Sequence, residues 1–164
     1  MASRAKAYCR VIGDEAHLLT GTKTAVMIDY GLASRKWPEG THRIVKALYP
    51  REAYGPDKKF IPKERKISGL IMTHPHLDHT GAIPQLEDGD YFEDNAKVYG
   101  SPQSLACFEM HAGVTLEHSP YCFTIFDLIR TLDRLVPLPK GVFQITPEFL
   151  IYAFHAGHVP GSAS

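Results

Sequence analysis

Residues 67–79 read Ile-Ser-Gly-Leu-Ile-Met-Thr-His-Pro-His-Leu-Asp-His and bring three histidines and one aspartate to the end of a short apolar run. The apolar and β-branched residues within 66–73 predict a buried strand. Residues two apart in an extended backbone project to the same side, so the rings of His74 and His76 are expected to aim at one point. The segment therefore predicts a cluster of ligand-type side chains at the carboxyl end of a strand.

Two more ligand-type residues in the segment are Asp78 and His79. They fall where residues 80–86 are predicted to open a helix, so their side chains are expected to point back over the end of the strand. Imidazole nitrogen and carboxylate oxygen suit zinc and, to a lesser degree, manganese or iron. Solvated loop histidines are the alternative, which the density of such residues over 74–79 disfavours.

The spacing His-x-His-x-Asp-His at residues 74–79 resembles the signature of the metallo-β-lactamase superfamily. Two further segments are similar to parts of that family. Residues 155–164 carry the expected next metal-binding histidine, His158, and residues 25–31 carry the family's early aspartate, Asp29. Together the three segments are spread over residues 25–164, nearly the whole sequence.

The resemblance implies an α+β fold, the four-layered αββα sandwich, with metals at one edge between its two sheets. It assigns one metal to three histidines, His74, His76 and His158. It assigns a second metal to Asp78 and His79, and it gives Asp29 a supporting role, bonding the ligand loop from behind. The implied cofactor is zinc in up to two sites, with manganese or iron as alternatives.

The resemblance also implies a reaction class. Two divalent ions lower the pKa of a bound water and clamp the attacked and leaving oxygens. Asp78 is the expected catalytic residue, holding that water in line and accepting its proton. The reaction is hydrolysis of an ester, thioester, amide or phosphodiester.

The sequence departs from the family at its end. The family's domain continues to a bridging aspartate and a final histidine, whereas this sequence ends six residues after His158. We expect residues 1–164 to form a single truncated domain, about the N-terminal half of the fold, with a mixed sheet and covering helices. Because the second metal then has only two ligands, we expect this chain alone to be a weak or inactive hydrolase. Self-association, a complementing C-terminal half and a degenerate remnant are the alternatives.

Residues 156–163, Ala-Gly-His-Val-Pro-Gly-Ser-Ala, resemble the corresponding segment of the β-CASP nucleases, but they lie between that pattern and the Gly-His-Thr-Pro-Gly-Ser of the general hydrolases, so both branches stay open. The first hypothesis is a zinc-dependent phosphodiesterase that acts on RNA. The second is a hydrolase of small esters or thioesters in the same fold. The third is a non-catalytic metal-binding or interaction fragment.

Composition narrows these classes only a little. The chain has 164 residues, 44% of them hydrophobic, and equal numbers of acidic and basic residues, which argues mildly against a strongly basic nucleic-acid-binding surface. It has no apolar run long enough to cross a bilayer and no signal-peptide core, so we expect a cytoplasmic protein that does not enter a membrane. Its cysteines, Cys9, Cys107 and Cys122, suggest no disulfide framework and are expected to be buried.

The rest of the chain alternates predicted strands and helices. Strands are expected at 7–12, 16–20, 24–29, 66–73, 96–99, 142–146 and 149–154, and helices at 41–49, 80–86, 102–110 and 123–135. In the last helix, Ile125, Leu128, Ile129, Leu132 and Leu135 are expected to face the core, opposite Asp127. We expect the basic run 58–66 to be a solvated loop rather than a contact with RNA. We expect His111 and His118 to be structural or solvated.

Overall fold

Six strands form one mixed sheet in the order β1-β2-β3-β4-β5-β6 in the computed structural model, which describes residues 7–11, 15–32, 66–118 and 123–163. The strands are β1 Tyr8–Val11, β2 His17–Thr20, β3 Ala25–Ile28, β4 Ile67–Ile71, β5 Phe92–Gly100 and β6 Leu135–Pro137. The first three pair antiparallel, as the predicted meander requires, and β3 to β6 pair parallel. The predicted helix at 41–49 and the basic residues 58–65 lie outside the described ranges.

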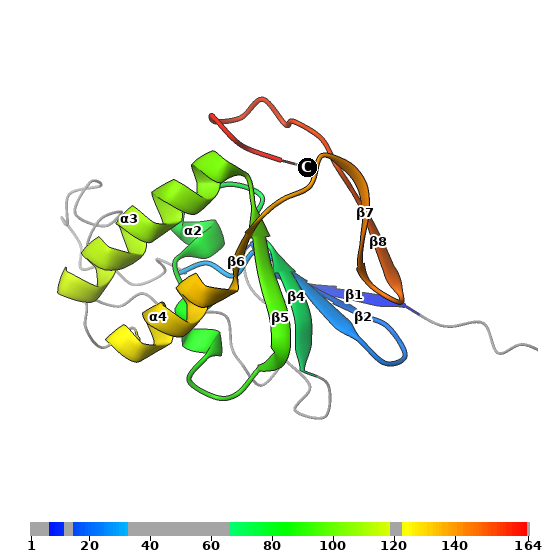
Figure 1. Ribbon diagram of the computed structural model, residues 1–164, viewed down its shortest axis with the longest axis horizontal. Coiled ribbons are helices and arrows are strands. Elements are labelled where there is room, and N and C mark those ends of the chain that lie inside the picture. The colour runs from blue at the N-terminus through cyan, green and yellow to red at the C-terminus, as the bar shows by residue number, and fades with distance from the viewer. Residues whose placement is uncertain (1–6, 12–14, 33–65, 119–122, 164) are drawn as a thin grey trace, which may run out of the picture.

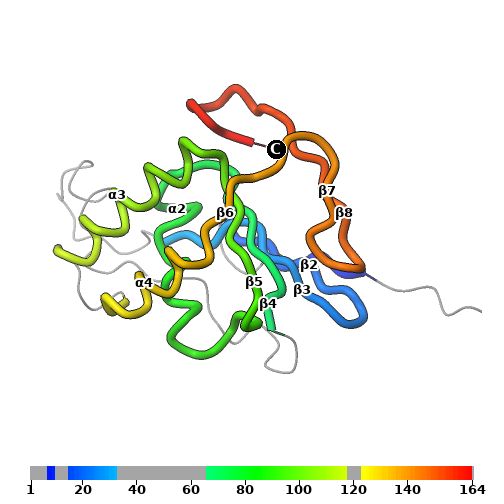
Figure 2. Tube along the Cα trace, in the orientation of Figure 1, coloured from blue at the N-terminus to red at the C-terminus, as the bar shows by residue number. Residues whose placement is uncertain are grey.

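The helices cover one face of this sheet, as Figures 1 and 2 show. They are α2 Leu77–Thr80, the 3₁₀ helix η2 Ile83–Leu86, α3 Pro102–His118 and α4 Ile125–Arg134. Strands β7 Gly141–Thr146 and β8 Phe149–Ala153 form a separate two-stranded sheet across from the helices (Figure 1). The ring of Phe143 in β7 lies 5.5 Å from that of Tyr99 in β5.

The core lies between the sheet and the helices. Its largest fully buried side chains are Leu18, Met27, Tyr30, Ile67, Leu70, Met72, Ile83, Leu86, Phe92 and Phe108. On the other side of the sheet, a Cβ added to Gly69 would lie 2.9 Å from Cδ1 of Ile145. The absence of a side chain at that position therefore lets β7 pack closely against β4.

The helix after the histidines begins earlier than the sequence predicts. The prediction started it at residue 80, whereas α2 starts at Leu77 and so includes Asp78 and His79. His76 is its N-cap in an extended conformation, φ −64° and ψ 146°, and Asp78 lies in the first turn, where the helix dipole favours a carboxylate. The helix ends at Gly81, and the chain continues as η2 rather than as one helix.

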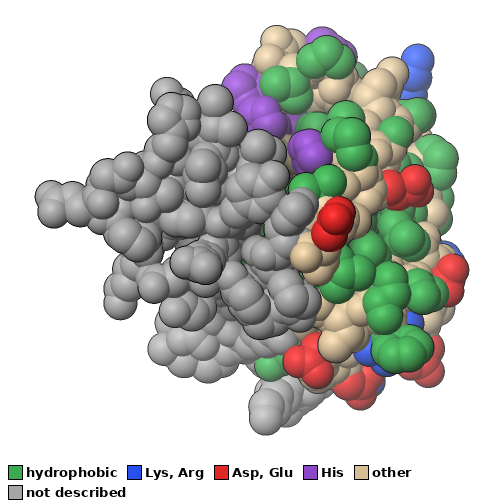
Figure 3. Space-filling model, turned by 90° about the vertical axis from the view of Figure 1, so that its left-hand side faces the viewer, with side chains coloured by type: hydrophobic (Ala, Val, Ile, Leu, Met, Phe, Trp, Pro, Cys, Tyr) green, Lys and Arg blue, Asp and Glu red, His purple; other side chains and the backbone are tan. Residues whose placement is uncertain are grey.

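The predicted core face of α4 is right for Leu128, which is buried, and for Leu132 and Leu135, which are partly buried against the core. It is wrong for Ile125 and Ile129, which are exposed, and for Asp127, which is buried. The reason is the capping box: the Asp127 carboxylate accepts hydrogen bonds from the backbone N–H and hydroxyl of Thr124, which fixes that side of the helix inward. Apolar side chains are scattered over the face of the molecule that Figure 3 shows.

The predicted burial of the cysteines is wrong for Cys9 and only partly right for Cys107. Cys9 is exposed because β1 is an edge strand, and Cys107 is half-buried in α3. Cys122 lies outside the described residues. The short strand β6 was not predicted, because the apolar pattern of α4 continues into Leu135 without a turn residue.

Candidate metal centre

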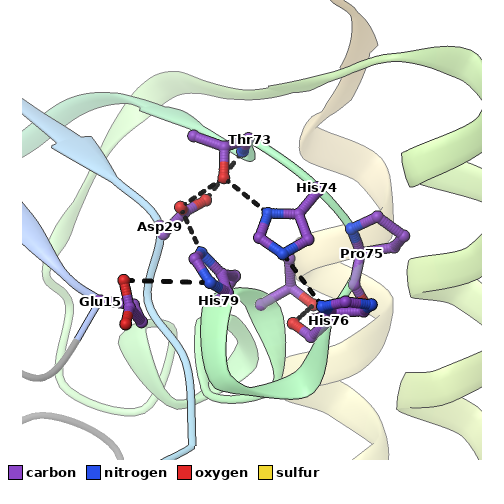
Figure 4. A network of polar contacts seen from close by, with 8 residues as sticks. Glu15, Asp29, Thr73, His74, Pro75, His76 and His79 are labelled. Carbon is purple, nitrogen blue, oxygen red and sulfur yellow. Dashed lines mark hydrogen bonds and ion pairs between the residues drawn. The ribbon is translucent and has the colours of Figure 1, made fainter. Parts of the chain in front are cut away.

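The candidate site lies where β3 and β4 end side by side. Ile28 pairs with Ile71 at the last register position of these parallel strands, and the backbone N–H of Asp29 donates to the carbonyl of Ile71 at 2.9 Å. Because parallel strands deliver their carboxyl ends to the same edge of a sheet, Asp29 meets the segment that carries the histidines. Figure 4 shows the resulting group of side chains.

The chain leaving β3 runs along α2 and fixes its position. The N–H of Tyr30 donates to the carbonyl of His79 at 2.7 Å, and the N–H of Leu32 donates to that of Leu77 at 2.9 Å. A Cβ at Gly31 would lie 1.5 Å from the carbonyl oxygen of Asp78. Only glycine allows this approach, so the exit of β3 positions the helix that bears Asp78 and His79.

The Asp29 carboxylate determines which nitrogen of His74 carries its proton. Its Oδ1 accepts from the N–H of Thr73 at 2.8 Å, and its Oδ2 accepts from the Thr73 hydroxyl at 2.6 Å. The hydroxyl has a single proton, so its 3.0 Å contact with Nδ1 of His74 must be donated by the ring. The lone pair of neutral His74 therefore lies on Nε2.

The same carboxylate orients His79. Nδ1 of His79 donates to Oδ2 of Asp29 at 2.8 Å, so the lone pair of the neutral ring lies on Nε2. Asp29 is 3% exposed and has a φ of 54°, a left-handed conformation that aspartate adopts more readily than most residues. One buried carboxylate thus sets the tautomers of two histidines.

Three histidines converge on one point. Nε2 of His74 lies 3.1 Å from Nδ1 of His76, and ligand nitrogens of His74, His76 and His158 all lie within 4.8 Å of one another. Tetrahedral zinc with Zn–N distances of about 2.0–2.1 Å requires nitrogens roughly 3.4 Å apart, so the donor set fits such an ion. Among the described residues, this is the only group of three or more ligand-type side chains within that distance of one another.

The predicted residues of the second site are placed differently. Asp78 is exposed, and neither Asp78 nor His79 belongs to the three-histidine group. The rings of His74 and His79 nevertheless lie with their centroids 3.8 Å apart. Their roles as ligands remain predictions.

His158 is delivered by a loop that is bonded to the histidine segment. The buried Ser162 hydroxyl accepts from the N–H groups of His158 and Val159 at 3.1 and 3.2 Å, which closes the turn. The N–H of Ala163 then donates to the carbonyl of Thr73 at 2.8 Å. Gly161 has a φ of 84°, a conformation that glycine adopts without strain.

The neighbouring rings His74 and His79 differ in protonation, and only the neutral form of each ring can bind a cation. Burial and the neighbouring rings of His79 and His76 lower the pKa of His74 to about 4, so this ring is neutral near pH 7. Burial pulls the pKa of His79 down, but its bond to Asp29 and the charges of Asp29, Asp78 and Glu15 outweigh burial and raise it. The ring of His79 therefore lies among excess negative charge.

Three residues near the site were not singled out from the sequence. Thr73 relays the hydrogen bond from Asp29 to His74, and Oε2 of Glu15 lies 3.9 Å from Nε2 of His79. His111, expected to be structural or solvated, contacts the carbonyl of Pro75 through Nδ1 at 3.2 Å and so supports the histidine loop. Glu15 comes near Asp29 because His17, two residues later, pairs with Ile28, the residue before Asp29.

Glu148 anchors the hairpin that leads to His158. Its carboxylate accepts from the N–H groups of Thr22, Lys23 and Thr24 at 2.8, 2.9 and 2.7 Å, and from the hydroxyls of both threonines. A Cβ at Gly21 would lie 2.5 Å from Oε2 of Glu148, so glycine is needed there. These bonds hold the pKa of Glu148 far below its usual range.

Glu148→Gln is expected to destabilise the chain at pH 7, because an amide cannot accept all of these bonds. A depressed carboxyl pKa stabilises the fold above about pH 4.3, the ordinary glutamate value, and this contribution is lost as the pH falls further. The difference in urea midpoint between parent and variant should therefore shrink from pH 7 to pH 3. Glu109→Gln, at an exposed position of α3, is the control, and a pH-independent difference would contradict this role.

The sequence is similar to several RNA-processing proteins, although no family model matches it. Ribonuclease J of Helicobacter pylori is 32% identical over 152 residues, which cover 90% of this chain and 18% of the relative. The transcription termination factor FttA of Thermococcus kodakarensis is 24% identical over 94% of this chain and 24% of its own length. A ribonuclease of Thermus thermophilus is 28% identical over 94% of this chain and 32% of its own length. The chain thus spans a third or less of these relatives.

Solved structures share the fold. An archaeal metallo-β-lactamase superfamily protein from Sulfolobus tokodaii matches 97% of this chain and 58% of its own, with a TM-score of 0.50 and 18% identity. A B3 metallo-β-lactamase with an active-site glutamic acid matches 96% of this chain and 52% of its own, with a TM-score of 0.53 and 21% identity. In the described part of the chain, no helix is long and apolar enough to cross a membrane.

These matches confirm the predicted fold class, of which the chain spans just over half. The shared fold and the sequence relatives confirm the resemblance to the metallo-β-lactamase superfamily that the motif at residues 74–79 indicates.

Proposed function

We propose that the chain carries a zinc-dependent phosphodiesterase site that acts on RNA and belongs to the β-CASP branch of the superfamily. The observation that carries this proposal is the convergence of His74, His76 and His158, with the lone pair of His74 directed into the cluster. Two relatives similar over most of this chain are named as ribonucleases, which supports RNA as the substrate. The resemblance of residues 156–163 to β-CASP nucleases supports the branch.

The residues have distinct proposed roles. His74, His76 and His158 hold the first ion, with zinc as the proposed metal and manganese or iron as alternatives. When bound, a divalent ion supplies a Lewis acid and lowers the pKa of water. Asp78 is exposed and lies next in the chain to His79, and we assign it the acceptance of a proton from the attacking water. Asp29 orients the rings of His74 and His79 from behind.

A hydrolase of small esters or thioesters is the second candidate. It is favoured by the shared fold with a B3 metallo-β-lactamase, which matches 96% of this chain. The sequence relatives, several of which are named as ribonucleases, favour RNA over a small substrate.

One set of assays distinguishes the two candidate functions. The zinc-loaded chain is incubated with 5′-labelled single-stranded RNA, with a nitrophenyl ester and with a thioester, and each reaction is repeated with EDTA and with His76→Ala. EDTA-sensitive cleavage of RNA that His76→Ala abolishes supports the proposal. Hydrolysis of the ester or thioester alone supports the second candidate. Bound zinc with no turnover on any substrate supports the third hypothesis, a non-catalytic metal-binding fragment.

A further inference from the structure

His79 lies between two carboxylates that contact its two ring nitrogens differently. Asp29 accepts from Nδ1 at 2.8 Å, whereas Oε2 of Glu15 lies 3.9 Å from Nε2 (Figure 4). A nitrogen–oxygen hydrogen bond spans about 2.7–3.2 Å, so the second contact is too long to be one. Nε2 of His79 therefore faces a carboxylate across a gap, and it offers a lone pair to a cation there once its proton is lost.

The gap has the width of a bridging cation. Zinc lies about 2.0–2.1 Å from an imidazole nitrogen and about 2.0–2.2 Å from a carboxylate oxygen, so one ion can span 3.9 Å with a bent angle. The His79 ring is 3.8 Å from that of His74, which belongs to the three-histidine cluster. An ion in this gap would therefore neighbour one bound by the cluster, as in two-metal sites, where the ions are about 3.5–4 Å apart.

We propose that Glu15 is a ligand of the second cation, together with His79 and with Asp78 from the same helix. Glu15 precedes β2, and the pairing of His17 with Ile28 brings it to the edge where β3 and β4 end. Its side chain is 46% exposed and that of His79 is 17% exposed, so the carboxylate can adjust to an ion while the ring stays fixed. Glu15 thus adds a carboxylate to a site for which the motif supplies only two ligands.

The inference rests on the proposed metal chemistry but not on RNA as the substrate. It is tested by titrating metal-free protein with Zn²⁺ in a calorimeter, and with Co²⁺ followed by visible absorption. The parent should bind two ions with different affinities. In Glu15→Gln the weaker affinity should fall at least tenfold, while the tighter site and the circular dichroism spectrum stay unchanged. Glu109→Gln, on the exposed surface of α3, should match the parent.

Glu15→Asp separates ligation from simple charge attraction. It keeps the negative charge but withdraws the carboxylate by about 1.5 Å, one carbon–carbon bond. Ligation predicts that Glu15→Asp loses the weaker site as Glu15→Gln does, whereas a pure charge effect would leave it bound. Parent-like second-site affinity in Glu15→Gln, or one ion per parent chain, would overturn the assignment of Glu15. Neither result would affect the first site, and absence of RNA cleavage with both ions bound would overturn only the proposed function.

Discussion

His76→Ala is expected to lower the affinity for the first zinc ion by more than about 100-fold. Partners that only orient metal ligands cost 10–100-fold when removed, and His76 supplies a nitrogen of the cluster itself, 3.1 Å from Nε2 of His74. His76 is exposed, whereas His74 is 7% exposed, so truncating His76 removes a ligand with little loss of packing. Equilibrium competition with a chromophoric zinc chelator measures the change.

His17→Ala is the matched control for this experiment. His17 lies in β2 and does not belong to the three-histidine group, so its loss should leave zinc affinity unchanged. Equal loss of zinc in both variants would show that the site has been misplaced. An unchanged melting temperature of metal-free His76→Ala would confirm that the loss is one of binding rather than of folding.

The pairing of His74 with His76 could be predicted because its cause is local: the two residues follow a recognisable strand at a spacing of two. His158 was expected to join them only because residues 155–164 resemble a family segment, since nothing local links it to a site more than eighty residues away. The orientation of α4 could not be predicted from periodicity, since a polar residue, Asp127, faces inward as a cap. A hydrophobic pattern treats every carboxylate as solvated, and so it places this one on the wrong side.

Contacts between distant segments could not be predicted from the sequence, for a different reason. Glu15 approaches His79 only through the antiparallel register of β2 and β3, and Glu148 reaches the turn before Thr24 across more than a hundred residues. Neither glutamate lies in a sequence motif that indicates metal binding or catalysis. The relay residue Thr73 lies directly before the motif, but the direction of its hydrogen bonds depends on two distances that only the folded chain provides.

Asp29→Asn is expected to weaken zinc binding roughly 10–100-fold while the chain still folds, because it reverses the hydrogen bonds behind two histidines. With its amide nitrogen in the place of Oδ2, asparagine donates to the Thr73 hydroxyl and to Nδ1 of His79. The Thr73 hydroxyl must then donate to Nδ1 of His74. Both rings would carry their protons on Nε2, the atoms expected to bind metal. The opposite amide orientation sets its NH₂ group against the N–H of Thr73.

Two comparisons isolate this effect from general destabilisation. Asp29→Ala removes every acceptor and leaves the part-buried N–H of Thr73 unpaired, at a cost of about 1–3 kcal/mol in unfolding free energy, whereas asparagine also tolerates the left-handed φ of 54°. Asp90→Asn is the control, since Asp90 has a φ of 56° and an exposed bond to Lys66. Long-range ¹H–¹⁵N spectra of the metal-free protein report the tautomers directly. Parent-like histidine spectra and zinc affinity in Asp29→Asn would show that Asp29 supports the loop without setting the tautomers of its rings.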